Sequence, residues 1–306
     1  MVRHTMRRLM PKAVRDRLKS SRQYEAVLAR RLASTSKRLD ICSAQFAQDF
    51  HLSRCPSLSG KVCPEIGSGW VLSHALLCHL LGAKTVLATD IVSHAHPEVL
   101  HTAIQESVAS IIRDALAPFE DHSLLRSRLD DLLRIRHFDL DVLERLGIQY
   151  LAPFDFARDR LGVPVDFVFS HSVLEHVPCE DVRALLDNVS ADLSPGGFMI
   201  SDMHLEDHQD ISGDPFGFLS LPGKEYSRSL QAARGNRIRK SVWQGYFNGM
   251  TGTRSRFIYE WSRGDKELPA HIDQSVRHEG TADLRISHIG VYTERPQCAG
   301  PADRCT

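Results

Sequence analysis

The stretch SDMHLEDHQD, residues 201–210, contains six ionisable side chains within ten residues. A histidine can remove a proton from an oxygen nucleophile near neutral pH, so His204 first and His208 second are candidates for a general base. Histidine and carboxylate groups can also hold a divalent metal that orients a diol. No partner cluster at a recognisable spacing supports that interpretation, and we assign no metal ligand. The third interpretation is a polar loop whose charges are solvated or pair with Arg237 and Arg239.

A second group of residues surrounds a glycine-rich turn, in which Glu65 precedes Gly67 and Gly69. Glycines let a ligand approach the backbone closely, and the start of a helix presents unpaired N–H groups to it. The third glycine of a dinucleotide-binding turn is absent, because Leu72 occupies its position. Glu65 would repel a pyrophosphate but attract an ammonium group. Asp90 follows 21 residues after Gly69, where a carboxylate can bind both ribose hydroxyls. A ligand with a ribose and a cation, such as S-adenosylmethionine, is therefore favoured.

The candidate residues can meet only if the strands that precede them end at the same edge of a sheet. Short apolar runs alternate with helical patterns, which predicts a parallel sheet covered by helices. The predicted strands are residues 61–66, 84–89, 149–151, 165–170 and 198–202, with 254–261 and 286–294 closing the sheet, and the predicted helices are 68–81 and 180–193.

Three segments extend this minimal sheet, and they set the predicted domain organisation. Residues 1–60 are predicted to be a mostly helical N-terminal region, and 61–306 the main domain. Within it, residues 92–147 are too long for one crossover, so we expect an inserted helical cap of two or three helices over the acceptor pocket. Residues 204–252 are rich in Gly, His and Arg, and we expect an irregular substrate loop.

Five motifs, taken in order, resemble those of class I S-adenosylmethionine-dependent methyltransferases that act on small molecules. They are VCPEIGSGW, VLATDI, YLAPFDF, VDFVFSHSVLEHVP and LSPGGFMISD. The resemblance covers residues 61–203 apart from the insertion. It implies a doubly wound, Rossmann-like α/β sheet of seven mostly parallel strands, the last of them antiparallel.

The resemblance also implies roles for individual residues. Glu65 and the two glycines would surround the methionine part of S-adenosyl-L-methionine, and Asp90 with Ile91 would bind the ribose side. Asp155 would accept a hydrogen bond from the adenine amino group and Phe156 would contact the ring edge. Asp155 also lies in a P-F-D-F sequence, where an aspartate often forms a turn.

The fourth-strand motif adds residues at the rim of the pocket. Ser170 and His171 end that strand, and His171 is expected to contact the cofactor or the acceptor. Glu175 and His176 lie in the short segment that follows, where the family usually places such residues, and we expect their role to be mainly structural.

Composition limits the partners. The 306 residues carry 38 Lys and Arg against 38 Asp and Glu, so net charge does not favour nucleic acid. Residues 1–40 hold twelve Lys or Arg against three acids, which suits a solvated helix face or peripheral contact with a membrane surface. There is no apolar run long enough to span a membrane. Seven cysteines without a C-x-x-C pattern indicate reduced thiols and a cytoplasmic protein.

The predicted function is methylation of an oxygen, with nitrogen second, on a small molecule or glycan. Two alternatives remain: a non-catalytic protein that binds S-adenosylmethionine for a partner, and a nicotinamide-dependent oxidoreductase with an irregular glycine turn. Methylation of a nucleic-acid base is disfavoured, because the fourth strand is followed by SHSV rather than an N-P-P-Y-type tetrad. The oligomeric state is left open.

Overall fold

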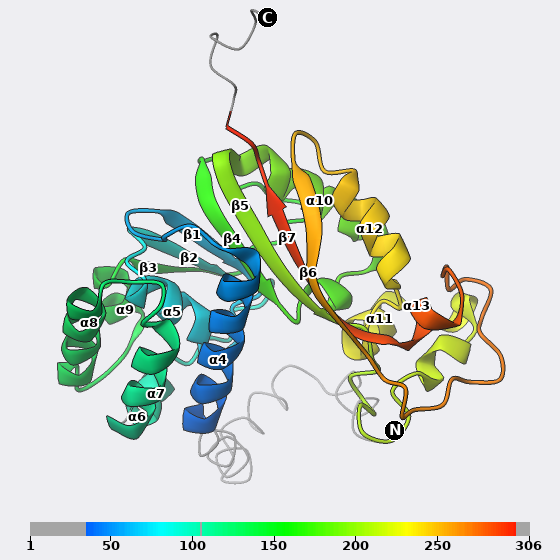
Figure 1. Cartoon of the computed structure of the whole chain (residues 1–306), viewed down its shortest axis with the longest axis horizontal. Coiled ribbons are helices and arrows are strands. Elements are labelled where there is room, and N and C mark those ends of the chain that lie inside the picture. Colours follow the sequence, from blue (N-terminus) through cyan, green and yellow to red (C-terminus); the bar gives the residue numbers. More distant parts are fainter. Residues whose placement is uncertain (1–34, 105, 298–306) are drawn as a thin grey trace, which may run out of the picture.

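The computed structural model describes residues 35–104 and 106–297. Its centre is a seven-stranded sheet in the order β3-β2-β1-β4-β5-β7-β6 (Figure 1). Strands β1 to β5 pair in parallel, and β7 is antiparallel to both β5 and β6. The predicted mostly parallel sheet with an antiparallel last strand is therefore confirmed. The strands are β1 (Val62–Ile66), β2 (Thr85–Thr89), β3 (Ile148–Leu151), β4 (Val165–His171), β5 (Leu193–His204), β6 (Arg254–Ser262) and β7 (Ile286–Glu294).

Helices cover both faces of the sheet, as a doubly wound fold requires. Side chains alternate between the faces of a strand, and β4 follows this rule. Phe167 and Phe169 join the core with α4 and α5, whereas Val168 joins the core with α10 and α12. The helices are α4 (Thr35–Ser53), α5 (Ser73–Leu80), α6 (Glu98–Ala103), α7 (Glu106–Leu116), α8 (His122–Arg134), α9 (Leu140–Arg145), α10 (Cys179–Asp192), α11 (Arg228–Arg234), α12 (Lys240–Asn248) and α13 (Thr281–Arg285), with short 3₁₀ helices η1 (Leu174–His176), η2 (Gly217–Ser220) and η3 (Gly223–Glu225).

Helix α5 begins at Ser73, later than the predicted start at residue 68. Three residues before it have left-handed backbone conformations, with φ of 72° at Gly67, 65° at Gly69 and 59° at Leu72. Left-handed residues cannot continue a right-handed helix. The chain therefore makes a wide turn after β1 before α5 starts.

The two long segments are more regular than the sequence predicted. Residues 92–147 form four helices instead of two or three, and α7 packs on α4, α8 on α5 and α9 on β3. Residues 204–252, expected to be irregular, contain α11 and α12, and α12 packs on α10 and on β6. Its buried Trp243 and Phe247 supply the apolar face that the loop prediction overlooked.

The N-terminal helical region is represented by α4, which lies beside the sheet (Figure 1). Phe46 and Phe50 on this helix make edge contacts with Phe169 and Phe167, with ring centroids 4.9 and 5.5 Å apart. Most of the basic stretch at residues 1–40 lies outside the described residues. Within the described part of the chain, none of the helices combines the length and apolar character needed to cross a bilayer.

Candidate functional site

The carboxyl ends of the parallel strands meet at one edge of the sheet. Ile66 on β1 lies opposite Thr89 on β2 and Ser170 on β4, and His171 lies opposite Asp202 on β5. The residues that follow these strands are therefore neighbours, although they are far apart in the sequence. This edge is where open α/β sheets bind ligands.

The glycine turn and Asp90 are in direct contact. The Gly69 N–H donates to Asp90 Oδ2 at 3.1 Å, and His94 Nε2 lies 3.5 Å from the same oxygen. A Cβ added at Gly69 would meet open space, whereas at Gly67 it would come within 2.5 Å of Val173 Cγ2. Next to Asp90, Ile91 exposes 67% of its surface. The turn thus leaves room for a ligand between a carboxylate and an exposed apolar side chain.

Glu65 lies in β1, just before this turn, and pairs with a histidine that was not among the predicted site residues. Its Oε1 is 3.1 Å from His74 Nδ1, while its Oε2 is buried with no hydrogen-bond partner among the described residues. Burial lowers the pKa of His74, but hydrogen bonds to Cys42 and Glu65 outweigh it and raise this pKa to about 10. His74 is therefore an imidazolium at neutral pH and balances the charge of Glu65. The residue is buried in the first turns of α5, where nothing in the sequence marks it as a partner of Glu65.

The loop after β3 lies beside Asp90, because the Phe154 N–H donates to the Asp90 carbonyl at 2.8 Å. The Asp155 carboxylate accepts from the Ala157 N–H at 3.0 Å and from Arg158 Nε at 3.1 Å. It therefore makes the turn that the sequence offered as the alternative role. Phe156 is buried against Phe154, with ring centroids 4.9 Å apart. The adenine contacts assigned to Asp155 and Phe156 stay predictions.

Ser170 and His171 have different environments. Ser170 is fully buried, and its hydroxyl has no hydrogen-bond partner among the described residues. His171 is partly exposed, and its Nδ1 lies 3.1 Å from Asp202 Oδ2. Because a carboxylate only accepts, Nδ1 carries a proton, so Nε2 is the basic atom of the neutral ring. This is the arrangement in which an aspartate orients a general base.

Asp202 is held by residues from three other elements. The Tyr259 hydroxyl donates to its Oδ1 at 2.8 Å, and Asp49 on α4 is its other carboxyl neighbour. Burial, followed by the charge of Asp202, raises the pKa of Asp49 well above its ordinary value, whereas burial of Asp202 is outweighed by His171 and Asp49, which lower its pKa. Asp49 is therefore the member of this pair that keeps its proton to the higher pH.

These residues border a small cavity of about 20 Å³ between α4 and the sheet edge. Helix α4 contributes Gln45, Gln48 and Asp49, which share one helix face. The sheet contributes His171 and Asp202 among others, and the residues lining this cavity include none from 92–147. The volume suffices for about one water molecule. A larger ligand requires a wall to move.

His204 also borders the cavity, but its ring is engaged by a second histidine. Its Nε2 lies 2.7 Å from His288 Nε2, and its Nδ1 is buried without a partner among the described residues. Burial, and then the proximity of the other histidine, lowers the pKa of His204 to about 3, and burial lowers that of His288 to about 4. The two rings are neutral and share one N–H···N bond. The role of His204 as a base stays a prediction.

Two acidic residues of the loop after β5, Glu206 and Asp207, are buried, whereas Asp210 is exposed. Glu206 accepts from Arg263 at 3.0 Å, and Asp207 pairs with Arg234. Arg237 and Arg239, expected as their partners, instead donate to backbone carbonyls. The loop was taken for a polar surface because its ion-pair partners lie far away in the sequence. His208, in the same loop, lies with its Nε2 3.5 Å from Glu175 Oε1.

The chain matches no protein-family model and none of the curated protein sequences. It is similar in structure to an S-adenosylmethionine-dependent methyltransferase from Mesorhizobium loti, with 18% identity over 82% of this chain and 100% of the other and a TM-score of 0.44. An O-methyltransferase family protein from Burkholderia thailandensis has 11% identity over 86% of this chain and 60% of that chain, with a TM-score of 0.41. The N-methyltransferase NodS from Bradyrhizobium japonicum WM9, in complex with S-adenosyl-L-homocysteine, has 12% identity over 83% of this chain and 88% of that chain, with a TM-score of 0.39. Likenesses this distant transfer neither an acceptor nor a residue's role.

Proposed function

We propose that this protein binds S-adenosylmethionine at the carboxyl ends of β1 to β3 and transfers its methyl group to an oxygen of a small molecule or sugar. The observation that carries the proposal is the contact between Gly69 and Asp90, at 3.1 Å. It joins a turn that is open to a ligand with a carboxylate suited to two ribose hydroxyls.

The surroundings of the turn fit the other parts of this cofactor. Glu65 Oε2 is buried and lacks a partner among the described residues, so it can accept a hydrogen bond from the α-ammonium group. Because His74 already balances the Glu65 charge, we expect this contact to act as a hydrogen bond more than as a net attraction. Ile91 offers an exposed apolar surface to the adenine ring. Asp155 and Phe156 would complete the adenine end.

His171 is our candidate for the general base, in preference to His204. When bound, the cofactor would supply an electrophilic methyl group on its sulfur atom. As the acceptor oxygen bonds to the methyl carbon, the carbon–sulfur bond breaks and the sulfur leaves as a thioether. His171 Nε2 would take the proton of the acceptor hydroxyl, and Asp202 would hold the ring and stabilise its cation. Holding the acceptor in line with the methyl group would supply much of the remaining rate enhancement.

Calorimetric titration with S-adenosylmethionine and with S-adenosylhomocysteine tests the cofactor site. Asp90→Ala should weaken both by about 2–3 kcal/mol, or roughly 30- to 150-fold, because hydroxyls that lose a charged partner remain buried. Asp141→Ala, an exposed acid on α9, is the control and should bind as the wild type does. Unchanged affinity in Asp90→Ala would remove Asp90 from the site. Tight binding of a nicotinamide cofactor in place of S-adenosylmethionine would overturn the proposal.

A second measurement separates an enzyme from a binding protein. The wild type should form S-adenosylhomocysteine when it is given S-adenosylmethionine and a small-molecule extract fractionated by size and charge. Active fractions would then identify the acceptor. If the protein binds the cofactor but turns over none of it with any fraction, the non-catalytic alternative is the correct one.

A further inference from the structure

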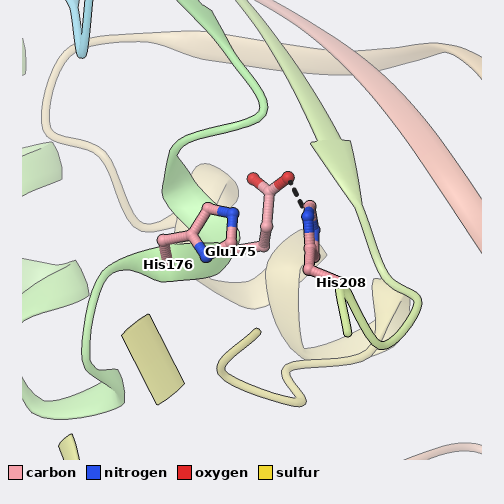
Figure 2. Close-up of side chains that lie close together, drawn as sticks. All are labelled: Glu175, His176 and His208. Atoms are coloured by element: carbon pink, nitrogen blue, oxygen red, sulfur yellow. Dashed lines mark ion pairs between the residues drawn. The ribbon is translucent and has the colours of Figure 1, made fainter. Parts of the chain in front are cut away.

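Three metal-binding side chains meet at the ends of β4 and β5. Glu175 and His176 belong to η1, directly after β4, and His208 lies in the loop that follows β5. One ligand atom from each lies within 4.8 Å of the other two. Figure 2 shows the carboxylate of Glu175 directed at the ring of His208, and the rings of His176 and His208 have centroids 4.3 Å apart. We propose that Glu175, His176 and His208 bind a divalent transition-metal ion of the zinc type.

Unpartnered buried atoms are the first support. Glu175 exposes 1% of its surface, and its Oε1 accepts from Ser172 Oγ at 2.9 Å and from the His204 N–H at 3.0 Å. Its Oε2 is buried without a hydrogen-bond partner among the described residues, and so is His208 Nε2. Buried polar atoms normally have partners, and leaving one without costs about 1–3 kcal/mol. A cation bound by the Glu175 carboxylate and by His208 Nε2 would give both atoms a partner.

The hydrogen bonding of His176 fixes the tautomer that a metal needs. Its Nδ1 lies 3.0 Å from the Ala232 carbonyl oxygen. A carbonyl can only accept, so Nδ1 carries the proton and Nε2 keeps its lone pair. Histidines that bind metals usually donate their second ring N–H to a carbonyl or carboxylate in this way.

One short segment, residues 232–236, supports all three candidate ligands. Its Ala232 carbonyl orients His176, and its Arg234 carbonyl accepts from the His208 N–H at 3.1 Å. The Asn236 N–H donates to the Glu175 carbonyl at 2.6 Å, and the Asn236 side chain donates to the carbonyls of Leu174 and Val177, both at 2.9 Å. A single rigid support of this kind is what keeps ligands in place for an ion.

The ligand set selects the kind of ion. Two imidazole nitrogens and one carboxylate oxygen suit zinc and its neighbours in the first transition row, whereas magnesium and calcium prefer oxygen ligands. Tetrahedral zinc with bonds of about 2.0–2.1 Å separates adjacent ligand atoms by about 3.3 Å. The 3.5 Å between His208 Nε2 and Glu175 Oε1 is close to that separation. Three protein ligands leave a fourth position for water or a substrate oxygen.

A neighbouring group, formed by His204, Glu206 and His288, is less suited to an ion. The two rings direct their Nε2 atoms at each other, 2.7 Å apart, and Glu206 already pairs with Arg263. An ion bound by both Nε2 atoms would have to break the contact between the two rings. This group therefore serves as the internal control.

The test uses the full chain, stripped with a chelator and titrated with zinc chloride in a calorimeter, without cofactor or acceptor. The wild type should bind one equivalent of zinc, confirmed by elemental analysis, and cobalt in its place should give visible absorption bands. Glu175→Gln and His208→Gln should each weaken zinc binding by at least about 100-fold, because losing a ligand exceeds the 10- to 100-fold effect of an outer-shell partner. His288→Gln, in the neighbouring group, and His122→Gln, on the surface, should bind as the wild type does.

Circular dichroism of each variant separates lost binding from lost folding. The side chain of His208 is 18% exposed, so its variant should fold even where the Glu175 variant does not. Zinc that binds equally well to the wild type and the His208 variant would overturn the proposal, as would loss of binding in His288→Gln alone. The zinc titration contains no cofactor, so its failure would leave the proposed methyl transfer untouched. Failure of the cofactor titration would likewise leave the proposed zinc site untouched.

Discussion

The two halves of the sheet's carboxyl edge differ in how far they are closed. Beside β1 and β2, Gly69 faces open space and Ile91 is 67% exposed. Beside β4 and β5, the polar side chains are mostly buried and pair with one another, as in the His171–Asp202 and His204–His288 contacts. The first half therefore has free space beside its glycine turn, while the other holds its reactive groups around a cavity of about 20 Å³.

This difference indicates a division of labour. An open surface with one carboxylate binds a ligand with little rearrangement, which suits a cofactor that is used by every reaction cycle. A buried set of oriented histidines and carboxylates has fixed protonation states, which suits proton transfer or metal binding. Variants that affect one half and spare the other should reveal this division.

The largest expected effect is on turnover in the buried half. His171→Ala should reduce turnover by about 100-fold or more, the range for a positioned base, while affinity for S-adenosylmethionine stays near the wild-type value. His204→Ala is the matched comparison, because both side chains border the same cavity. Rates of S-adenosylhomocysteine formation check both variants. A large loss in His204→Ala together with a small one in His171→Ala would return the base to His204.

The two glycines of the open half should respond differently to alanine. Gly67→Ala adds left-handed strain and a Cβ within 2.5 Å of Val173, so unfolding free energy should fall by about 2–4 kcal/mol. Gly69→Ala adds only the strain, about 1–2 kcal/mol, and directs its methyl group into the open space of the turn. Urea denaturation should therefore rank Gly67→Ala as the less stable variant.

Cofactor titration completes that comparison. Gly69→Ala should lose affinity for S-adenosylmethionine out of proportion to its loss of stability, because its methyl group occupies the ligand's space. If Gly69→Ala binds the cofactor as tightly as the wild type, the open space beside the turn is not the binding site.

The smallest expected effect is a pH-dependent gain in stability from Asp49→Asn, of about 1 kcal/mol. Burial and the charge of Asp202 raise the pKa of Asp49 above its ordinary value of 3.8. A group whose pKa is higher in the folded state makes its full contribution to stability below its pKa in the unfolded state. That contribution is lost as the pH rises through its pKa in the folded state. Asparagine keeps a donor and has no proton to lose, so its advantage should grow from about pH 4 upwards. Thermal unfolding across pH 4–8 measures this, and a variant less stable at every pH would contradict the assignment of Asp49 as the neutral partner.

Much of the fold follows from local sequence patterns. The seven strands were predicted within a few residues at nearly every end, because short apolar runs bounded by turns leave few other conformations. The exception was β5, which begins at Leu193, the residue that was predicted to end the preceding helix, five residues before the predicted start of the strand. Helix α12 was also missed, because KSVWQGYFN buries Trp243 and Phe247 in a stretch otherwise rich in Gly and Arg.

The open half of the site was largely predictable and the buried half was not. Glu65, Gly67, Gly69 and Asp90 lie in two short motifs at the ends of adjacent strands, so spacing alone indicates that they meet. The partners in the other half come from remote segments: Tyr259 from β6 donates to Asp202, and His288 from β7 contacts His204. Sequence spacing carries no information on such contacts.

The sequence by itself thus determined the strands, the glycine turn and the acid that faces it, because these depend on residue types at short range. Only the tertiary structure decided that His74 balances Glu65, that Asp202 orients His171, and that Glu175 and His176 meet His208. The physical reason is that protonation and ligand geometry depend on burial and on distances of a few ångströms. Both are set by how the helices pack on the sheet.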